Sequence, residues 1–497
     1  MRHFSLIISL CLSVTFCFQR LSAQQFNGFF TSDFSGVLGL GEQPASVANS
    51  PYKYDFNLVN GNIYLANNIA HTAKNSEGAI RLIRFDDTET KYVKGNASLG
   101  GLSVLLSLSR KRGVGIRYNV RSVMNGTEIS PNFVAQINRF NSPEYTGRTY
   151  LNEQLNFSSA TWQELAFTYG GLLRDDGVNR IKLGVTLKAV NPMGHAWAVL
   201  ERADYDVLAD GRLDVNRFNL RAGYSANLDG YEPFDGTNAM RIPPQGTGYK
   251  LSGADIGLVY ERVAFRADPK SASGTSLHPD ITYEFRVSAS ITDIGTMTMD
   301  YGSASFATTG LNPNANSADF NSLFTGVTSF RAFRNSLENY LTTTDVSGTY
   351  TVSLPTALRL NYDYNFGNNF YFNAAALADL SWAMPADFRV SYINHLMLTP
   401  RYETGIYGVY LPIMYNFSND TEVGLAARYG PFTIGTHTLE TLFKKEKTSA
   451  GFFFSISISQ LKANARKPYC FGSSRVGSAM VRKQRTPIYK RKKFIFF

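Results

Sequence analysis

Few residues of this chain have the types and spacing that catalysis or metal binding requires. The six histidines are dispersed, with no i, i+4 pair and no cysteine partner, so a zinc site lacks its ligands. The glycine-rich stretch at 36–41 is neither a phosphate-binding loop nor a dinucleotide fingerprint, because no strand–helix unit surrounds it. Ser391 and His395 would share one strand face, as a hydrolytic dyad needs, but such pairs often arise by chance. We therefore expect no enzyme, no metal and no cofactor.

Charged residues at alternate positions of apolar segments are the second group of candidates. From 114 to 121, an apolar row alternates with a row that contains Arg117 and Arg121, and a strand places the two rows on opposite faces. A soluble sandwich rarely buries arginine, whereas the lumen of a membrane barrel is polar. The same argument gives the residues expected to face the lumen, where they would line a solute path or form internal ion pairs: Arg117, Arg121, Lys182, Lys188, Glu284, Arg286, Arg359, Asp363 and Arg428.

The segments that would position these charges are strands of about ten residues. Alternation with period two recurs at 102–108, 114–120, 165–169, 181–187, 256–260, 283–291, 358–364, 370–376, 409–415 and 454–458. Short turns are expected at 110–113, 174–180, 365–369 and 403–405. Long connections are expected near 125–159, 192–251 and 295–350. Short turns at one rim and long loops at the other are typical of outer-membrane barrels, so residues 51–460 are predicted to form one all-β, transmembrane antiparallel barrel of about 14 strands, in the range of roughly 12–16.

Composition excludes the main alternatives to a barrel. Charged residues make up 18% of the chain and aromatic residues 13%, whereas disordered and coiled-coil chains have more charge and fewer rings. No apolar stretch of about 18 residues is present, so spanning helices are not expected. The net charge of +10 comes from the chain ends, because 461–497 contains eleven basic residues and no acid. The body of the chain is near neutral, and we expect no nucleic-acid partner.

Three segments lie outside the strand pattern. Residues 1–23 combine basic residues, an apolar run and a small residue before Gln24, which predicts a cleaved signal peptide. Residues 24–50 are rich in Gly and Ser and are expected to form a plug in the barrel mouth or a periplasmic leader. Apolar residues at helical spacing in 320–341 predict an amphipathic loop helix. The basic tail at 461–497 would be a periplasmic extension attracted to anionic polymer or lipid, or the product of a shifted reading frame.

Several sequence blocks follow one another in a characteristic order, at 39–68, 162–190, 255–261, 286–295, 350–366, 398–416 and 424–436. This succession resembles an uncharacterised Bacteroidetes-type family of outer-membrane barrels that is catalogued as a domain of unknown function. More distantly, a plug with Pro-Ala-Ser before about 14 strands is similar to the FadL-type long-chain fatty-acid transporters. That family usually has Asn before Pro-Ala, whereas this chain has Gln43 before Pro44, Ala45 and Ser46. The resemblance implies a location in a Gram-negative outer membrane and, less directly, transport.

Two functions are compatible with these expectations. The first is porin-like passage of a hydrophobic or amphiphilic small molecule through a plugged, monomeric barrel, which needs an apolar pocket near residues 24–50. The second is a non-transporting barrel that serves as an anchor or assembly partner for surface or secretion machinery. That function predicts a lumen sealed by ion pairs and a periplasmic or surface protein partner. In both cases the barrel is in contact with outer-membrane lipid.

Overall fold

The computed structural model describes residues 28–74, 80–84, 89–136, 142–230, 246–263, 283–311, 327–417, 421–439 and 448–461. The predicted signal peptide, and all of the predicted basic tail except Leu461, lie outside these residues. No helix within the described ranges has both the length and the hydropathy needed to cross a membrane.

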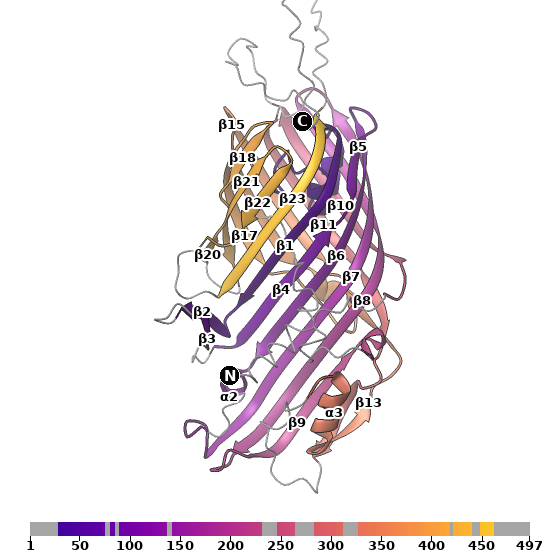
Figure 1. Cartoon of the computed structure of the whole chain (residues 1–497). Helices are drawn as coiled ribbons and strands as arrows, with labels where there is room; N and C mark the ends of the chain where they lie inside the picture. Colours follow the sequence, from indigo (N-terminus) through magenta and orange to yellow (C-terminus); the bar gives the residue numbers. More distant parts are fainter. Residues whose placement is uncertain are drawn as a thin grey trace, which may run out of the picture.

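The fold is an antiparallel barrel of about 14 strands, closed where the last strand pairs with the first (Figure 1). Four of the strands are interrupted, two of them at Pro355 and Pro412, because proline has no N–H for the strand ladder. In chain order the strands of the ring are β1 (Tyr52–Asn67), β4 (Lys91–Gly100) with β5 (Ser103–Ser107), β6 (Arg112–Ile129), β7 (Arg148–Asp175), β8 (Asn179–Val207), β10 (Lys250–Val263), β11 (Tyr283–Asp300), β14 (Thr349–Ser353) with β15 (Ala357–Gly367), β16 (Phe370–Asp379), β17 (His395–Glu403), β18 (Tyr407–Tyr410) with β19 (Ile413–Asn416), β20 (Thr421–Val423) with β21 (Leu425–Tyr429), β22 (Phe432–Thr436) and β23 (Ser449–Leu461).

Exposure alternates along the strands, as the period of two predicts. In β7, Leu165 and Phe167 are 46% and 48% exposed, whereas Glu164 and Thr168 are 1% and 0% exposed. The apolar row therefore lies on the outside of the barrel and the polar row on the inside. This arrangement confirms the predicted all-β barrel.

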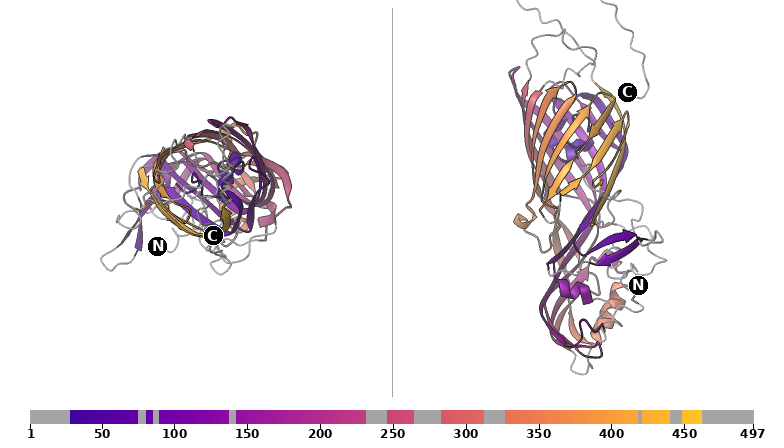
Figure 2. Two further views of the ribbon diagram at one scale, coloured as in Figure 1. Left: turned by 90° about the horizontal axis from the view of Figure 1, so that it is seen from above. Right: turned by 90° about the vertical axis from the view of Figure 1, so that its left-hand side faces the viewer.

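The two ends of the barrel differ. Connections are short at the end where Leu461 lies, at the top of Figure 1, and they include 108–111, 176–178, 368–369 and 404–406. At the other end β7 and β8 continue well beyond the barrel. They have 28 and 29 residues, whereas about ten residues are enough for a strand to cross a membrane. They form an extension with β9 (Leu213–Tyr224), β12 (Phe306–Leu311) and β13 (Leu341–Asp345), as Figure 2 shows. A separate hairpin pairs β2 (Ala70–Lys74) with β3 (Ile80–Arg84).

The helices of the described ranges are short, and none belongs to the strand ring itself. The predicted loop helix is present as α3 (Phe330–Glu338), and it is shorter than the interval 320–341. Ser329 caps its first turn by accepting a hydrogen bond from Ala332 N, which fixes where the helix begins. Residues 320–326 lie outside the described ranges, and Leu341 already belongs to β13. The remaining helical elements are α2 (Pro131–Gln136), η1 (Leu38–Gly41), η2 (Pro44–Val47), η3 (Ala226–Leu228) and η5 (Ser381–Ala383).

Candidate functional site

Residues 28–50, here called the plug, lie inside the barrel near the end with short connections (Figure 2). The turn η2 packs against four consecutive strands of the wall, β6, β7, β8 and β10. At the contact these strands carry glycine: a Cβ on Gly184 would overlap the backbone of Ala45, and one on Gly257 would overlap the side chain of Gln43. Only glycine leaves this room. We call the four residues the glycine lane: Gly113, Gly170, Gly184 and Gly257.

Gln43 fastens the predicted Gln-Pro-Ala-Ser motif to the wall. Its side-chain oxygen accepts a hydrogen bond from Ala45 N at 3.2 Å and caps η2. Its amide nitrogen donates to the carbonyl oxygens of Leu258 (3.3 Å) and Ala289 (3.1 Å), on β10 and β11. Pro44 and Ala45 are buried in the contact. The motif therefore attaches the plug to the barrel and does not itself line an open channel.

Side chains along the rest of the plug form further contacts with the wall. Asp33 accepts hydrogen bonds from Tyr283 Oη at 2.7 Å and from Arg286 Nη1 at 2.5 Å. Glu42 forms an ion pair with Arg359 on β15. Polar anchors therefore hold the plug on several sides of the lumen at once.

A second segment enters the lumen from the opposite end. Residues 380–394, here called the inward loop, connect β16 to β17, and their Val390 is completely buried. Asn125 on β6 holds the loop through two hydrogen bonds: its amide donates to Ser391 O (2.9 Å), and its side-chain oxygen accepts from Ser391 N (2.8 Å). Tyr392 follows and contacts Arg121. This second closure could not be predicted from the sequence, because the segment lacks both strand and helix periodicity.

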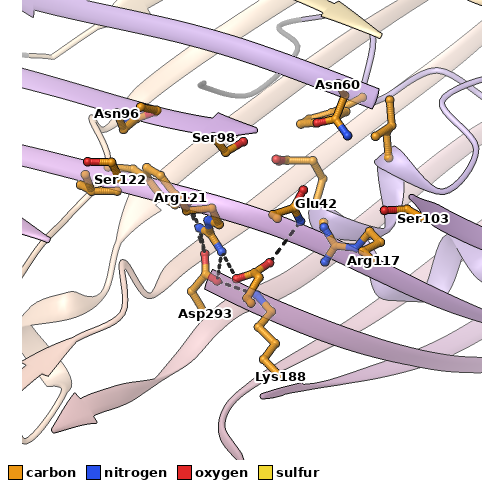
Figure 3. A pocket seen from close by; sticks show the side chains of 18 of the residues that line it. Glu42, Asn60, Asn96, Ser98, Ser103, Arg117, Arg121, Ser122, Lys188 and Asp293 are labelled. Carbon is orange, nitrogen blue, oxygen red and sulfur yellow. Dashed lines mark hydrogen bonds and ion pairs between the residues drawn. The ribbon is translucent and has the colours of Figure 1, made fainter. Parts of the chain in front are cut away.

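A cavity of about 80 Å³ lies between the plug and the inward loop (Figure 3). Glu42 of the plug and Tyr392 of the inward loop both line it. Most of the remaining lining residues are polar or charged, and those with amide or hydroxyl side chains are Asn60, Asn96, Ser98, Ser103, Asn119 and Ser122. The cavity, here called the central cavity, is therefore not the apolar pocket that a hydrophobic molecule would need.

Buried ion pairs form one wall of the central cavity. Arg121 contacts Glu164 and Asp293, each at 2.7 Å, and Lys188 contacts Asp293 at 2.5 Å and Asp255 at 2.7 Å. Asp293 has a positive φ of 60°, a conformation in which Asp is enriched among non-glycine residues. Its carboxylate thereby reaches cations from two strands. Charges as buried as these are stable only when they are paired.

The nine predicted lumen residues separate into two groups and one exception. Arg117, Arg121, Lys188 and Arg359 line the central cavity. The second group lies around the plug and towards the short turns, and its members form ion pairs. Lys182 pairs with Glu261 at 2.6 Å, Arg286 pairs with Asp33, and Asp363 pairs with Arg401 at 2.6 Å. Arg428 donates to backbone carbonyls of the 404–406 turn.

Glu284 is the exception, and its predicted lumen position is wrong. Its side chain is 46% exposed and lies 3.5 Å from Arg262, which is also exposed. The cause is an irregularity in the register, since Arg262 pairs with Phe285 but Val263 pairs with Tyr283. The shift turns Tyr283 into the lumen, where it is 2% exposed.

Several site residues were missed from the sequence. The carboxylates Glu164 and Asp255 alternate with apolar neighbours just as the predicted cations do, so the same period would have found them. Asp293 has the phase of the outward residues Ala289 and Ile291, and its buried position depends on an irregularity in the register of β10 and β11 that the period does not reveal. Ser391 and His395 do not share a strand face, because Ser391 lies in the inward loop and His395 Nδ1 contacts Ile393 O at 3.0 Å. Within the described ranges, no three His, Cys, Asp or Glu side chains are placed to hold a metal ion.

Several solved structures resemble this chain at low sequence identity. The TodX deltaS2S3 mutant, a monoaromatic hydrocarbon channel, is 10% identical with a TM-score of 0.40, over 90% of this chain and 98% of that chain. A Pseudomonas aeruginosa FadL homologue is 10% identical with a TM-score of 0.36, over 88% and 95%. The Pseudomonas putida toluene transporter TodX is 9% identical with a TM-score of 0.32, over 86% and 95%. Likeness of this degree does not show what this chain carries.

No curated protein matches the sequence significantly. A family model does match, described as a family of unknown function (DUF5723), and it covers residues 44–437. The match begins at the Pro-Ala-Ser element of the plug and extends through most of the barrel. Because it includes well over half of the chain, the chain belongs to the family of unknown function DUF5723.

Proposed function

We propose that this chain is an outer-membrane barrel that admits a small amphiphilic or polar molecule when the plug and the inward loop move. The apolar outer rows support the membrane location, because lipid is the environment that suits such a face. We further propose that residues 1–23 direct export in a Gram-negative, Bacteroidetes-type cell. The lumen and both closures come from one chain, which supports a monomeric unit.

The central cavity is the observation that carries this proposal. A barrel filled only for stability would gain most from a densely packed interior. Here a cavity of about 80 Å³ is retained between two separately anchored closures. The amide and hydroxyl lining favours a molecule with a polar part over a pure hydrocarbon.

Conductance of the purified mature chain in planar bilayers tests the proposal. The variant Asp33→Asn/Glu42→Gln removes the charges that hold the plug to Arg286 and Arg359, without changing the barrel wall. We expect the wild type to be nearly closed and the variant to show frequent openings, because the plug loses both of these ion pairs with the wall.

Glu284→Gln is the matched control, since it removes an exposed carboxylate that does not contact the plug. It should behave like the wild type. Absence of conductance in every plug variant, including one that lacks residues 28–50 but still folds, would reject passage through the barrel.

A non-transporting barrel that serves as an anchor or assembly partner is the second candidate. The observation that favours it is the extension of β7, β8, β9, β12 and β13 beyond the ring, which solute passage does not require. Its own apolar core includes Tyr205, Leu213 and Leu341. If the plug variants are closed, deletion of the extension followed by a search for lost surface assemblies becomes the decisive experiment.

A further inference from the structure

Arg117 differs from the other cations of the central cavity. Arg121, Lys188 and Arg359 each form an ion pair with a carboxylate. Arg117 is 7% exposed, and its Nε and Nη2 have no hydrogen-bond partner among the described residues. Burying a guanidinium without an acceptor costs free energy, because its hydration is lost and nothing replaces it. A cation kept in this state beside an empty space indicates a place for an anion.

The plug holds Arg117 in this position. A Cβ added to Gly41 of η1 would lie 2.7 Å from Nη1 and 3.4 Å from Cζ of Arg117, so the guanidinium packs directly against the backbone of the plug. On β6, the side chain points into the central cavity in Figure 3. The unpaired cation is therefore part of the site only while the plug is docked.

Among the described residues, Arg117 is the cation of the cavity lining that forms no ion pair with a lining carboxylate. Four cations line the cavity, together with three carboxylates, Glu42, Glu164 and Asp293. A further carboxylate, Asp255, contacts Lys188 but does not line the cavity. All three lining carboxylates are already bound to cations other than Arg117. An incoming anion would therefore find one cation that has no competing partner.

We propose that the central cavity binds a small hydroxylated carboxylate, with Arg117 pairing with the carboxylate. Guanidinium and carboxylate match each other in charge and planar geometry. The hydroxyl groups would meet the amide and hydroxyl side chains of the lining, which include Asn60, Ser103 and Asn119; Ser103 lies beside Arg117 in Figure 3. The space open to water centres is about 80 Å³, where one water needs roughly 10–15 Å³, so the cavity has room for a small molecule with several polar groups. The inference rests on the proposed function for the ligand's route, but binding itself does not require transport.

Isothermal titration of the folded, full mature chain in detergent tests the site with defined probes. Gluconate supplies a carboxylate with hydroxyls, sorbitol has the hydroxyls alone, octanoate has the carboxylate alone, and glucose 6-phosphate has a phosphate instead. We expect gluconate to bind best, and Arg117→Gln to weaken it about tenfold or more, because the charged contact is lost. Arg174→Gln is the matched control, since that arginine is 65% exposed on a surface turn.

Each of the other outcomes contradicts a particular part of the proposed binding site. Equal binding of gluconate and sorbitol, no binding of gluconate, or unchanged affinity in Arg117→Gln would overturn the anion site. Stronger binding of octanoate or of glucose 6-phosphate would overturn the hydroxylated carboxylate as the class. Arg117→Lys keeps the charge and should retain part of the affinity, which separates loss of the anion contact from a folding defect. Binding without conductance in the plug variants would reject passage through the barrel and leave the anion site supported. Conductance without binding would reject the anion site and leave passage supported.

Discussion

At the scale of single residues, the lumen is organised by carboxylates that serve more than one cation. Asp293 is the clearest case, because it contacts Arg121 of β6 and Lys188 of β8 and accepts a hydrogen bond from Tyr392 of the inward loop at 3.4 Å. Such sharing joins strands that are not neighbours in the ring. Loss of this shared carboxylate therefore removes a partner from two buried cations at once, and leaves Arg121 with Glu164 and Lys188 with Asp255.

Asp293→Asn should lower the free energy of unfolding by about 3–5 kcal/mol, the usual cost of removing one partner from a buried ion pair. Urea titration of the barrel in detergent micelles, followed by intrinsic fluorescence, measures the change. Glu284→Gln serves as the surface counterpart, and its change should stay within about 1 kcal/mol, as for exposed pairs. Similar losses in both variants would mean that the internal network does not stabilise the barrel.

At the scale of elements, alternation and turn length were enough to predict the barrel but not its closures. Lys188 and Arg359 face the lumen because a strand has a period of two, and this period is visible in the sequence. Which carboxylate meets which cation depends on register: Arg121 and Asp293 lie 172 positions apart. Nor does a period reveal the inward loop, whose position depends on contacts with β6 and β14.

The glycine lane makes docking of the plug sensitive to one methyl group. In Gly257→Ala, the new Cβ would overlap the side-chain oxygen of Gln43 and crowd the ring of Pro44. The amide of Gln43 must then move away from its hydrogen bonds to Leu258 O and Ala289 O, which weakens the attachment of η2 to the wall. We expect more frequent openings in planar bilayers with an unchanged barrel. Gly310→Ala, in β12, is the control because no atom lies within 4 Å of the added Cβ. Conductance unchanged by Gly257→Ala would show that the lane does not hold the plug closed.

The inward loop should respond to acid through Asp387. Its carboxylate accepts hydrogen bonds from Thr351 N (2.8 Å) and Thr351 Oγ1 (2.9 Å), and these bonds lower the pKa of Asp387. A lowered pKa means that the contact is fully formed above the ordinary value of about 3.9 and is lost as pH falls through the lower, folded value. Hydrogen exchange of residues 380–394, corrected for intrinsic rates, should therefore rise below about pH 4.

Asp387→Asn removes the titrating group and should make exchange in the inward loop faster and independent of pH over the same interval. Exchange at the barrel strands should not change. A wild-type loop whose corrected exchange stays constant down to pH values well below about 4 would show that Asp387 does not hold it.

At the scale of the whole molecule, the two closures meet at one residue. Arg359 forms an ion pair with Glu42 of the plug, and its guanidinium carbon lies 5.4 Å from the ring centre of Tyr392 in the inward loop. The closures lie in series along the lumen, so release of the plug alone should produce fewer openings than release of both closures. A residue that touches both can release both, and Arg359→Gln should therefore open the barrel more than Glu42→Gln or Tyr392→Ala. If Arg359→Gln does no more than Glu42→Gln, the plug and the inward loop open independently, and the cavity between them is entered from one side at a time.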